Sequence, residues 1–274
     1  MEPSFVQANG LRFAYLEQGT GPLVLFMHGF PDTAYTWDAS LAAVAAAGFR
    51  GVAAFQRGYY PSEIPKTDPT TDELGADVVA LIEALGAKSA VVVGHDWGAT
   101  AAYSAAITAP DRVKLLVVTA IPHPAAVRPT PALAWKVRHF FTLSRKNAAA
   151  KLRATEFAYV DDLVHRWSPA WTVPAGETDR VKDAFRQPGC CEAAVGYYRA
   201  QKLRITGTLA KPVTVPTVCF AGETDIIPPR AYEKARHMFT ASYEVVQMPG
   251  GHFMHREAPD QFTSELVRVL RDHA

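Results

Sequence analysis

The stretch Val91-Val-Val-Gly94-His95-Asp96-Trp97-Gly98-Ala-Thr100 decides which fold this sequence is expected to adopt. An apolar run of strand length leads into a G-x-D-x-G turn, and a helix-like segment follows, which is the form of a nucleophile elbow. Glycines flank the turn because larger side chains would collide there. Asp96 then stands at a helix N-terminus, where the helix dipole stabilises an anion. A simpler interpretation makes Asp96 only the N-cap of an ordinary turn.

Short apolar runs recur along the chain and alternate with helix-like stretches. Asn9-Gly10, inside the alternating segment 5–18, is a strong hairpin signal. Runs that are apolar on both faces suit a sheet covered on both sides by helices. We therefore predict an α/β fold with a mostly parallel central sheet flanked by helices. The predicted strands span 23–27, 51–55, 90–93, 115–121, 215–221 and 243–248, and the predicted helices span 40–47, 71–85, 98–109, 230–239 and 259–272.

This alternation stops between Pro122 and Pro212. The segment has no convincing strand run, is interrupted by prolines, and carries Trp135, Trp167 and Trp171. An inserted helical cap is the simplest account. The predicted division is a core formed by residues 1–121 and 213–274, interrupted by a cap at 122–212.

Composition narrows the classes of protein that this chain can represent. It has 274 residues, 49% of them hydrophobic, and 28 Lys+Arg against 27 Asp+Glu. A disordered chain is therefore excluded, and no general nucleic-acid binding is expected. Three cysteines cannot form a disulfide framework, no signal segment opens the chain, and the early apolar run 23–27 is too short to span a membrane. We expect a cytoplasmic protein without a membrane segment, and we leave open whether it forms a homodimer.

The near-neutral net charge conceals a basic segment, residues 125–153, which contains no acidic residue. The plainer interpretation is a solvated face of the cap, balanced elsewhere by Asp161, Asp162 and Glu177. The alternative is a cap that attracts anionic substrates or an acidic partner. The basic residues are Arg128, Lys136, Arg138, Arg145, Lys146, Lys151 and Arg153.

Other segments supply the groups that would assist a nucleophile: backbone donors for an oxyanion hole, a histidine and a second carboxylate. His28-Gly-Phe30-Pro follows an apolar run, and the backbone N–H groups of Phe30 and Trp97 form a candidate oxyanion hole. Asp225 follows the run 215–221, and His252 lies in a glycine-rich loop between a strand and a helix. The order nucleophile, acid, histidine fits this fold. Glu223 is the nearest rival to Asp225.

Taken together, these motifs resemble the α/β-hydrolase superfamily, and specifically its epoxide-hydrolase-like and dehalogenase-like branch. The resemblance covers nearly the whole chain. It implies that Asp96 is the nucleophile, His252 the general base and Asp225 the carboxylate that orients His252. It also implies that a helical cap covers the active site. The residues that carry it are His28-Gly-Phe-Pro31, Gln56-Arg-Gly-Tyr59, Gly94-His-Asp-Trp-Gly98, Pro122-His-Pro124, Tyr198-Arg199 and Gly251-His-Phe-x-x-x-Glu257-x-Pro259.

An aspartate nucleophile selects the reaction. Attack on an ester or amide carbonyl would give an anhydride, whereas attack on a saturated carbon gives an alkyl ester that histidine-activated water can hydrolyse. Asp96 therefore favours C–O cleavage in epoxides or C–halogen cleavage, and the absence of serine at the elbow excludes an ordinary serine hydrolase.

The leaving group should decide between these two reactions. In epoxide hydrolases the cap typically supplies two tyrosines, and Tyr198 matches one of them. The segment 138–143, where the other is expected, has none; His139 or Phe140 stands there. Our hypothesis is a His139–Tyr198 pair, with Tyr159 as a weaker candidate donor. Phe30, Trp97 and Phe140 are expected to contact substrate.

Dehalogenation is less favoured by the same motifs. Haloalkane dehalogenases usually place asparagine after the His-Gly pair, where this chain has Phe30. Fluoroacetate dehalogenases place arginine after the nucleophile, where this chain has Trp97. We predict an epoxide hydrolase without a cofactor, acting on a small molecule, either an epoxide or an organohalide. The alternatives are a haloalkane or haloacid dehalogenase and a non-catalytic ligand-binding protein of the same fold.

Four other polar residues are expected to be structural. His95 and Glu257 match the family pattern as braces, and Asp77 is expected to be a solvated or capping carboxylate. His252 and His255 have the spacing of a metal pair, but no third ligand is near them in the sequence, so we expect no metal.

Overall fold

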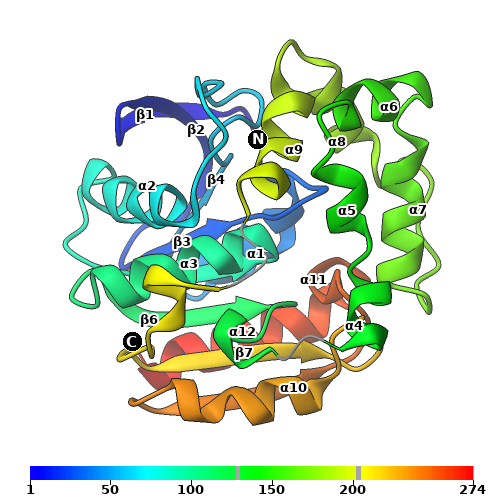
Figure 1. The fold of residues 1–274 in the computed structure, drawn as a ribbon. Coiled ribbons are helices and arrows are strands. Elements are labelled where there is room, and N and C mark those ends of the chain that lie inside the picture. The colour runs from blue at the N-terminus through cyan, green and yellow to red at the C-terminus, as the bar shows by residue number, and fades with distance from the viewer. Residues whose placement is uncertain (128–129, 202–204, 274) are drawn as a thin grey trace.

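The computed structural model describes residues 1–127, 130–201 and 205–273 and has the predicted α/β fold (Figure 1). Its single sheet has eight strands in the order β1-β2-β4-β3-β5-β6-β7-β8. The strands are β1 (Ser4–Ala8), β2 (Leu11–Gln18), β3 (Leu23–Met27), β4 (Arg50–Ala54), β5 (Ala90–His95), β6 (Val113–Thr119), β7 (Thr217–Gly222) and β8 (Tyr243–Met248).

The sheet is antiparallel at one edge and parallel elsewhere. β1 pairs with β2 around Asn9-Gly10, both of which have positive φ, and β2 pairs antiparallel with β4. From β4 through β3, β5, β6 and β7 to β8 every pairing is parallel. The carboxyl ends of β3, β5, β7 and β8 therefore lie at the same edge of the sheet, where the four motifs that follow these strands meet.

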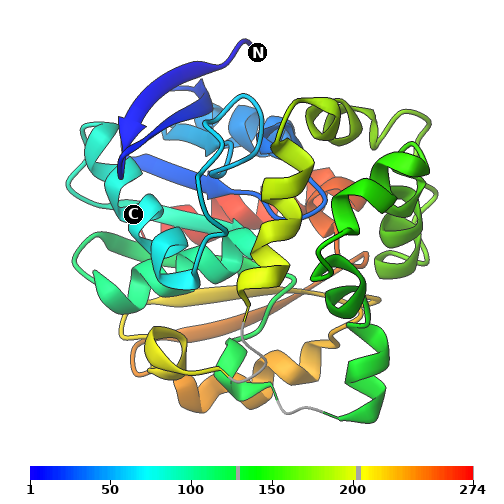
Figure 2. The same ribbon diagram turned by 45° about the horizontal axis from the view of Figure 1, so that its top comes forward.

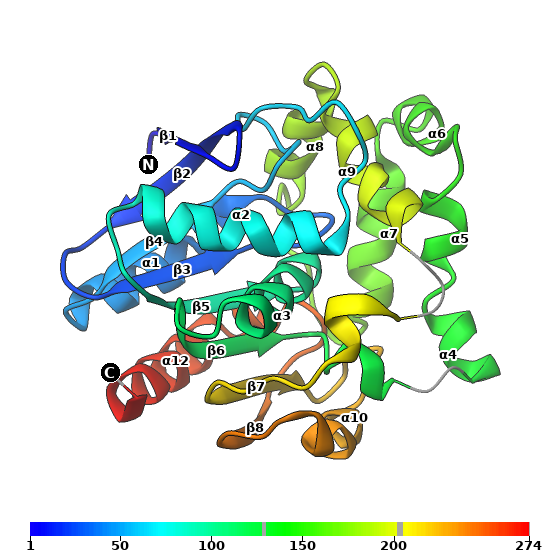
Figure 3. The same cartoon turned by 60° about the vertical axis from the view of Figure 1, so that its left-hand side comes forward.

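Helices cover both faces of the sheet, so the central strands are buried on both sides. Figure 3 shows α2 (Thr71–Ala84) and α3 (Trp97–Thr108) on one face and α1 (Asp38–Ala46) and α12 (Pro259–His273) on the other. Leu25 and Val92 pack with the first pair, and Phe26 and Val93 pack with the second. Among the described residues, no helix is both long enough and apolar enough to cross a membrane.

Within the predicted cap segment, 122–212, the secondary-structure elements that the structure describes are all helices, joined by turns and loops, and none of the named strands lies there. Its helices gather at one end of the sheet (Figures 1 and 2). The cap boundary at 122–212 remains our prediction. The α-helices of this segment are α4 (Pro131–Lys136), α5 (His139–Leu143), α6 (Ala148–Ala154), α7 (Ala158–Trp167), α8 (Asp179–Arg186) and α9 (Cys190–Ala200).

The basic segment 125–153 is partly paired in the structure. Lys136 Nζ donates to the Ile226 carbonyl oxygen, 2.9 Å away, and the Arg138 guanidinium lies 4.4 Å from the centre of the exposed Trp135 ring. Arg153 pairs with Glu192. Arg128 lies outside the described residues.

The predicted helix 230–239 is shorter than expected. α10 (Pro229–Lys234) gives way to a 3₁₀ turn, Ala235–Met238. The chain leaves the helical path there because Phe239 forms a parallel bridge with Val213, and its ring stacks on Tyr243 with ring centres 4.0 Å apart.

The prediction for Asp77 was wrong. Its carboxylate is buried inside α2 and accepts two hydrogen bonds from Arg57, one from Nε and one from Nη2. Asn9 donates a third, at 2.7 Å. The ion pair ties the hairpin, the loop after β4 and α2 together. A buried charge needs such a partner because removing it from water is costly.

Replacing Asp77 with asparagine should therefore destabilise the fold. Asp77→Asn leaves the buried Arg57 guanidinium with only Glu73 as a counter-charge, 3.6 Å away and partly exposed, and we expect the free energy of unfolding to fall by about 3 kcal/mol. Urea unfolding followed by circular dichroism measures this. Glu233→Gln, at an exposed pair with Arg236, should cost less than about 1 kcal/mol. Equal losses in the two variants would contradict the argument.

Candidate active site

The candidate nucleophile sits in a strained turn between β5 and α3. Asp96 has φ 52° and ψ −117°, a backbone conformation that residues other than glycine rarely adopt. Its side chain makes no capping hydrogen bond, so the N-cap interpretation does not account for it. A Cβ atom at Gly94 or Gly98 would collide with the backbone of a neighbouring element, and one at Gly29 would collide with Asp96 itself. The glycines thus let the turn pack closely.

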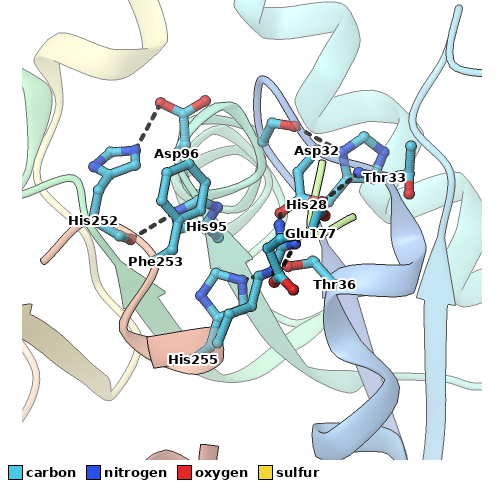
Figure 4. Close-up of polar contacts among 12 residues, drawn as sticks. His28, Asp32, Thr33, Thr36, His95, Asp96, Glu177, His252, Phe253 and His255 are labelled. Carbon is cyan, nitrogen blue, oxygen red and sulfur yellow. Dashed lines mark hydrogen bonds and ion pairs between the residues drawn. The ribbon is translucent and has the colours of Figure 1, made fainter. Parts of the chain in front are cut away.

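The other two predicted members of the site lie beside this carboxylate. His252 Nδ1 lies 3.2 Å from Asp225 Oδ1, and His252 Nε2 lies 3.7 Å from Asp96 Oδ2. Figure 4 shows the imidazole of His252 pointing at the Asp96 carboxylate. Asp225 is buried, whereas its rival Glu223 is exposed and makes no bond to His252 among the described residues.

The two predicted backbone donors also adjoin Asp96. The N–H of Phe30 donates to Asp96 Oδ1 at 2.8 Å. Trp97 opens α3, so its N–H has no acceptor within the helix. Trp97 also lines a pocket of about 210 Å³ together with Tyr197 and Leu209. The Phe30 N–H is therefore bonded to the Asp96 carboxylate, and the Trp97 N–H belongs to the residue that follows Asp96.

Charges in the site reinforce each other. Burial alone would lower the pKa of His252, but the carboxylates of Asp225 and Asp96 outweigh it and raise the pKa to about 10. Burial opposes ionisation of Asp96, yet the nearby His252, through its position and charge, and the hydrogen bond from the Phe30 N–H lower the pKa of Asp96 below its usual value. Both shifts favour the charged pair, an aspartate anion beside a protonated imidazole.

Aromatic side chains of the predicted cap segment pack against Phe30 and Trp97, the two residues whose N–H groups adjoin Asp96. The ring of Tyr198 lies 5.2 Å from those of Phe30 and Trp97, 5.0 Å from Phe140 and 5.8 Å from His139, centre to centre. Within the described part of the chain, Tyr198 Oη and His139 Nδ1 are buried without a hydrogen-bond partner. Burial raises the pKa of Tyr198 well above 10 and lowers that of His139 to about 3, so both are neutral.

Tyr159, the weaker candidate donor, is not among the rings around Tyr198. It is half-buried on α7, and the guanidinium of Arg166 lies 5.9 Å from the centre of its ring. The structure therefore brings His139, rather than Tyr159, into ring contact with Tyr198.

Trp167 contacts the site although the sequence singled it out only as one of several cap tryptophans. Its ring lies 4.8 Å from that of His252 and 4.6 Å from that of His139. Its carbonyl oxygen accepts the backbone N–H of His252 at 3.1 Å. The only sequence signal was the clustering of tryptophans in the cap, which does not say which one faces the site.

The loop that carries His252 is fastened to the cap. Glu257 Oε1 accepts hydrogen bonds from Ser168 Oγ and from the N–H groups of Gly251 and Phe253, so Glu257 is a brace, as expected. Arg256 Nε donates to Glu177 at 2.6 Å, and its Nη1 donates to Asp32 at 3.1 Å. The cap segment around 167–178 thus shares a buried network with the loop.

Behind this loop lies a row of histidines, visible in Figure 4. His95 Nε2 lies 3.0 Å from the His252 carbonyl oxygen, and His255 Nε2 lies 2.6 Å from Thr36 Oγ1. His95 therefore braces the loop, as predicted. The described residues contain no group of three or more His, Cys, Asp or Glu able to hold a metal ion.

The chain matches known proteins over nearly its whole length. The family model described as alpha/beta hydrolase fold matches residues 22–259. An epoxide hydrolase of Caballeronia sordidicola is 30% identical over 97% of this chain and 92% of its own. An AB hydrolase superfamily protein of Bacillus subtilis is 30% identical over 98% and 97%. The crystal structure of a Bacillus megaterium epoxide hydrolase with an inhibitor shares the fold, with TM-score 0.87, 22% identity and coverage of 98% and 100%.

Buried neutral histidines predict how stability depends on pH. Burial lowers the pKa of His123 and His28 to about 4, and that of His95 and His139 to about 3. These groups take up protons near pH 6.5 only when the chain unfolds. Above pH 6.5 these histidines are neutral in both the folded and the unfolded chain, so they do not affect the free energy of unfolding. As the pH falls from 6.5 towards 4, proton uptake favours the unfolded chain and the free energy of unfolding decreases.

We expect the free energy of unfolding to fall between pH 6.5 and 4, by up to about 1.4 kcal/mol per pH unit for each such histidine. Denaturant unfolding at stepped pH measures the slope. His123→Gln should make the slope shallower, and His165→Gln, at an exposed position of α7, should leave it unchanged. A slope that His123→Gln does not alter would contradict this assignment.

Proposed function

This chain belongs to the α/β-hydrolase fold family, and we propose that it is an epoxide hydrolase that opens epoxides to vicinal diols through an ester on Asp96. The observation that carries the proposal is the carboxylate at the elbow, facing His252 at 3.7 Å and lying beneath two neutral cap donors. Its epoxide-hydrolase relatives of similar length support the same reaction. The proposed substrate is a small molecule that enters between the core and the cap.

In the first step, we propose that Asp96 attacks an oxirane carbon. The carboxylate oxygen forms a C–O bond while the ring C–O bond breaks, and the leaving alkoxide takes the phenolic proton of Tyr198. A neutral phenol with a raised pKa is able to do this because it stays protonated until an alkoxide appears. His139 Nδ1, if it carries the imidazole proton, donates a second hydrogen bond to the same oxygen.

The charge change on Asp96 prepares the second step. Once Asp96 is an ester, one of the two carboxylates that hold the proton on His252 is gone, so the pKa of His252 falls. His252 returns a proton to the Tyr198 phenolate and becomes a base. It then takes a proton from water, whose oxygen attacks the ester carbonyl carbon. The N–H groups of Phe30 and Trp97 receive the developing oxyanion. When this intermediate collapses, the ester C–O bond breaks and the departing alkoxide takes a proton from the His252 imidazolium, which completes the diol. The new carboxylic acid of Asp96 then returns a proton to His252, which restores the Asp96 carboxylate.

Asp225 supports this cycle without reacting. Its carboxylate faces His252 Nδ1, fixes the orientation of the ring and stabilises the imidazolium that forms when water is deprotonated. Phe30, Trp97 and Phe140 supply apolar walls that exclude bulk water from the ester.

We also propose the cytoplasm as the location of the chain. The three cysteines are free and buried, which fits a reducing compartment. The homodimer remains a prediction, and light scattering of the purified protein would test it.

Removing the base should trap the ester. In His252→Gln, attack by Asp96 can proceed but water is not activated, so incubation with an epoxide such as styrene oxide should add the mass of the epoxide to the peptide that contains Asp96. Intact-mass and peptide mass spectrometry measure this. Asp96→Asn should show neither adduct nor diol, while the exposed His237→Gln should turn over normally. A wild-type enzyme that releases halide from organohalides, yet forms no diol from any epoxide, would contradict the proposal.

The contributions of Tyr198 and His139 to activity can be measured separately, with the neighbouring Tyr197 as a control. Tyr198→Phe should lower kcat/KM for epoxides by roughly 100-fold because general-acid assistance is lost. Tyr197→Phe is the matched control: its hydroxyl donates to the Arg57 carbonyl oxygen at 2.9 Å, away from the nucleophile. His139→Phe should cause a smaller loss. Full activity in Tyr198→Phe would remove Tyr198 from the mechanism.

A further inference from the structure

Two large aromatic side chains of the predicted cap segment stand out into solvent. Trp135, on α4, is 69% exposed, and Phe141, on α5, is 57% exposed; no other large apolar side chain among the described residues is as exposed as these. The other four tryptophans of the chain are buried or half-buried. Exposed apolar groups that lie together often mark a surface that a partner covers.

The local backbone places these two rings on one side, together with a guanidinium. Between α4 and α5 the chain is wound by hydrogen bonds between residues three apart. The Arg138 N–H donates to the Trp135 carbonyl oxygen at 3.4 Å, and the Phe141 N–H donates to the Arg138 carbonyl oxygen at 3.1 Å. Residues three apart lie above one another in this geometry. The Arg138 guanidinium accordingly lies 4.4 Å from the centre of the Trp135 ring.

The opposite side of α5 is covered. His139 and Leu143 are buried, and the Phe140 ring lies 5.0 Å from that of Tyr198, centre to centre. Phe141 follows directly and is exposed. Figure 3 shows α4, α5 and α6 along the right-hand margin of the molecule. This helix thus carries apolar side chains on two sides, and only its inner side has a partner within the described chain.

Unpaired positive charge surrounds the two rings. Residues 125–153 contain no acidic residue. Arg145 and Lys146 are exposed in the turn after α5. Of the basic residues that the structure describes in this segment, only Arg153 has a carboxylate partner. The surface therefore combines exposed aromatic rings with cations whose charge is available to a partner.

We propose that this surface docks on a membrane that contains anionic lipids. Tryptophan is enriched where a membrane meets water, because its ring is apolar and its N–H is polar. Arginine and lysine are attracted to the negative charge of anionic headgroups. Aromatic and basic side chains together are typical of segments that lie on a membrane without crossing it. We call the surface the α4–α5 face; it consists of Trp135, Arg138, Phe141, Arg145 and Lys146.

Other partners match the α4–α5 face less well. A two-fold contact with a second copy would place the same unpaired cations opposite each other, which is unfavourable. A nucleic acid can meet the charges and stack on the rings. The net charge of the whole chain is only +1, however, and nucleic-acid-binding domains usually have a large basic excess. An anionic membrane meets both the rings and the charges.

Vesicle sedimentation tests the proposal. At low salt, wild-type protein should sediment with vesicles of phosphatidylcholine and phosphatidylglycerol, and much less with vesicles of phosphatidylcholine alone. Trp135→Ser/Phe141→Ser removes both rings and should lower the partition coefficient by roughly 10-fold or more. Arg145→Gln/Lys146→Gln should lower it by a similar factor, roughly 10-fold or more. Added salt should weaken wild-type binding because ions screen the attraction.

Brominated lipids locate the contact. Bromine atoms on the acyl chains quench the fluorescence of a tryptophan that enters the membrane, and Trp135 is the exposed tryptophan of this chain. Wild-type fluorescence should therefore fall on brominated anionic vesicles. Trp135→Tyr keeps an interfacial aromatic ring, so it should still sediment, but its fluorescence should not be quenched. Quenching that persists in Trp135→Tyr would place the contact on another surface and overturn the assignment.

The matched controls lie outside the α4–α5 face. Phe5→Thr removes an exposed ring from the edge strand β1, and Lys66→Gln/Lys88→Gln removes two exposed charges from the core. Both controls should bind vesicles like the wild type, and every variant should keep the wild-type circular dichroism spectrum. Wild-type binding by both α4–α5 variants would overturn the inference, as would equal losses in the controls.

The other partners give different results in the same variants. A single-stranded oligonucleotide that binds through the α4–α5 face, without sedimentation on anionic vesicles, would overturn the inference in favour of a nucleic acid. A homodimer that dissociates in Trp135→Ser/Phe141→Ser, again without sedimentation, would overturn it in favour of a second copy. Light scattering measures the second case. None of these measurements depends on turnover, so their outcome is independent of the proposed function.

Discussion

The positive φ of Asp96 is the constraint on which the site depends. A residue with a side chain keeps this conformation only when its surroundings hold it there, and here three glycines allow β3, β5 and α3 to approach closely enough to do so. Because these elements meet at the carboxyl edge of a parallel sheet, the loops after β7 and β8 reach the same point. The sheet order therefore brings together side chains that lie far apart in the sequence.

Opposite charges then set the chemical state of the site. An aspartate beside an imidazolium is neutral as a pair, and each partner keeps the other ionised in a buried place. Chemistry that consumes the charge of one partner changes the proton affinity of the other. The apolar rings around them strengthen this coupling because they lower the local dielectric. The aromatic rings of the predicted cap segment thus contribute to the electrostatics of the site.

Much of this arrangement could be predicted from the sequence, for physical reasons. Fully buried parallel strands appear as continuous apolar runs, and the elbow requires glycines at fixed positions around Asp96. Asp77 was misjudged because its partner Arg57 lies in a loop, and a sequence does not show which charges will meet. The contacts of Trp167 with His252 and His139 depend in the same way on how short helices pack, which no periodicity in the sequence encodes.

The hydrogen bond from the His252 backbone to the Trp167 carbonyl oxygen, with the neighbouring Glu257–Ser168 contact, has a consequence for protein engineering. A cap is often regarded as an exchangeable module that changes substrate range while the core stays constant. In this chain, the stretch from Trp167 to Glu177 is bonded to the loop of the core that carries His252 and helps to position that residue. Chimaeras that replace the whole insertion would misplace His252, whereas recombination confined to α4–α6 would leave these contacts to the His252 loop in place.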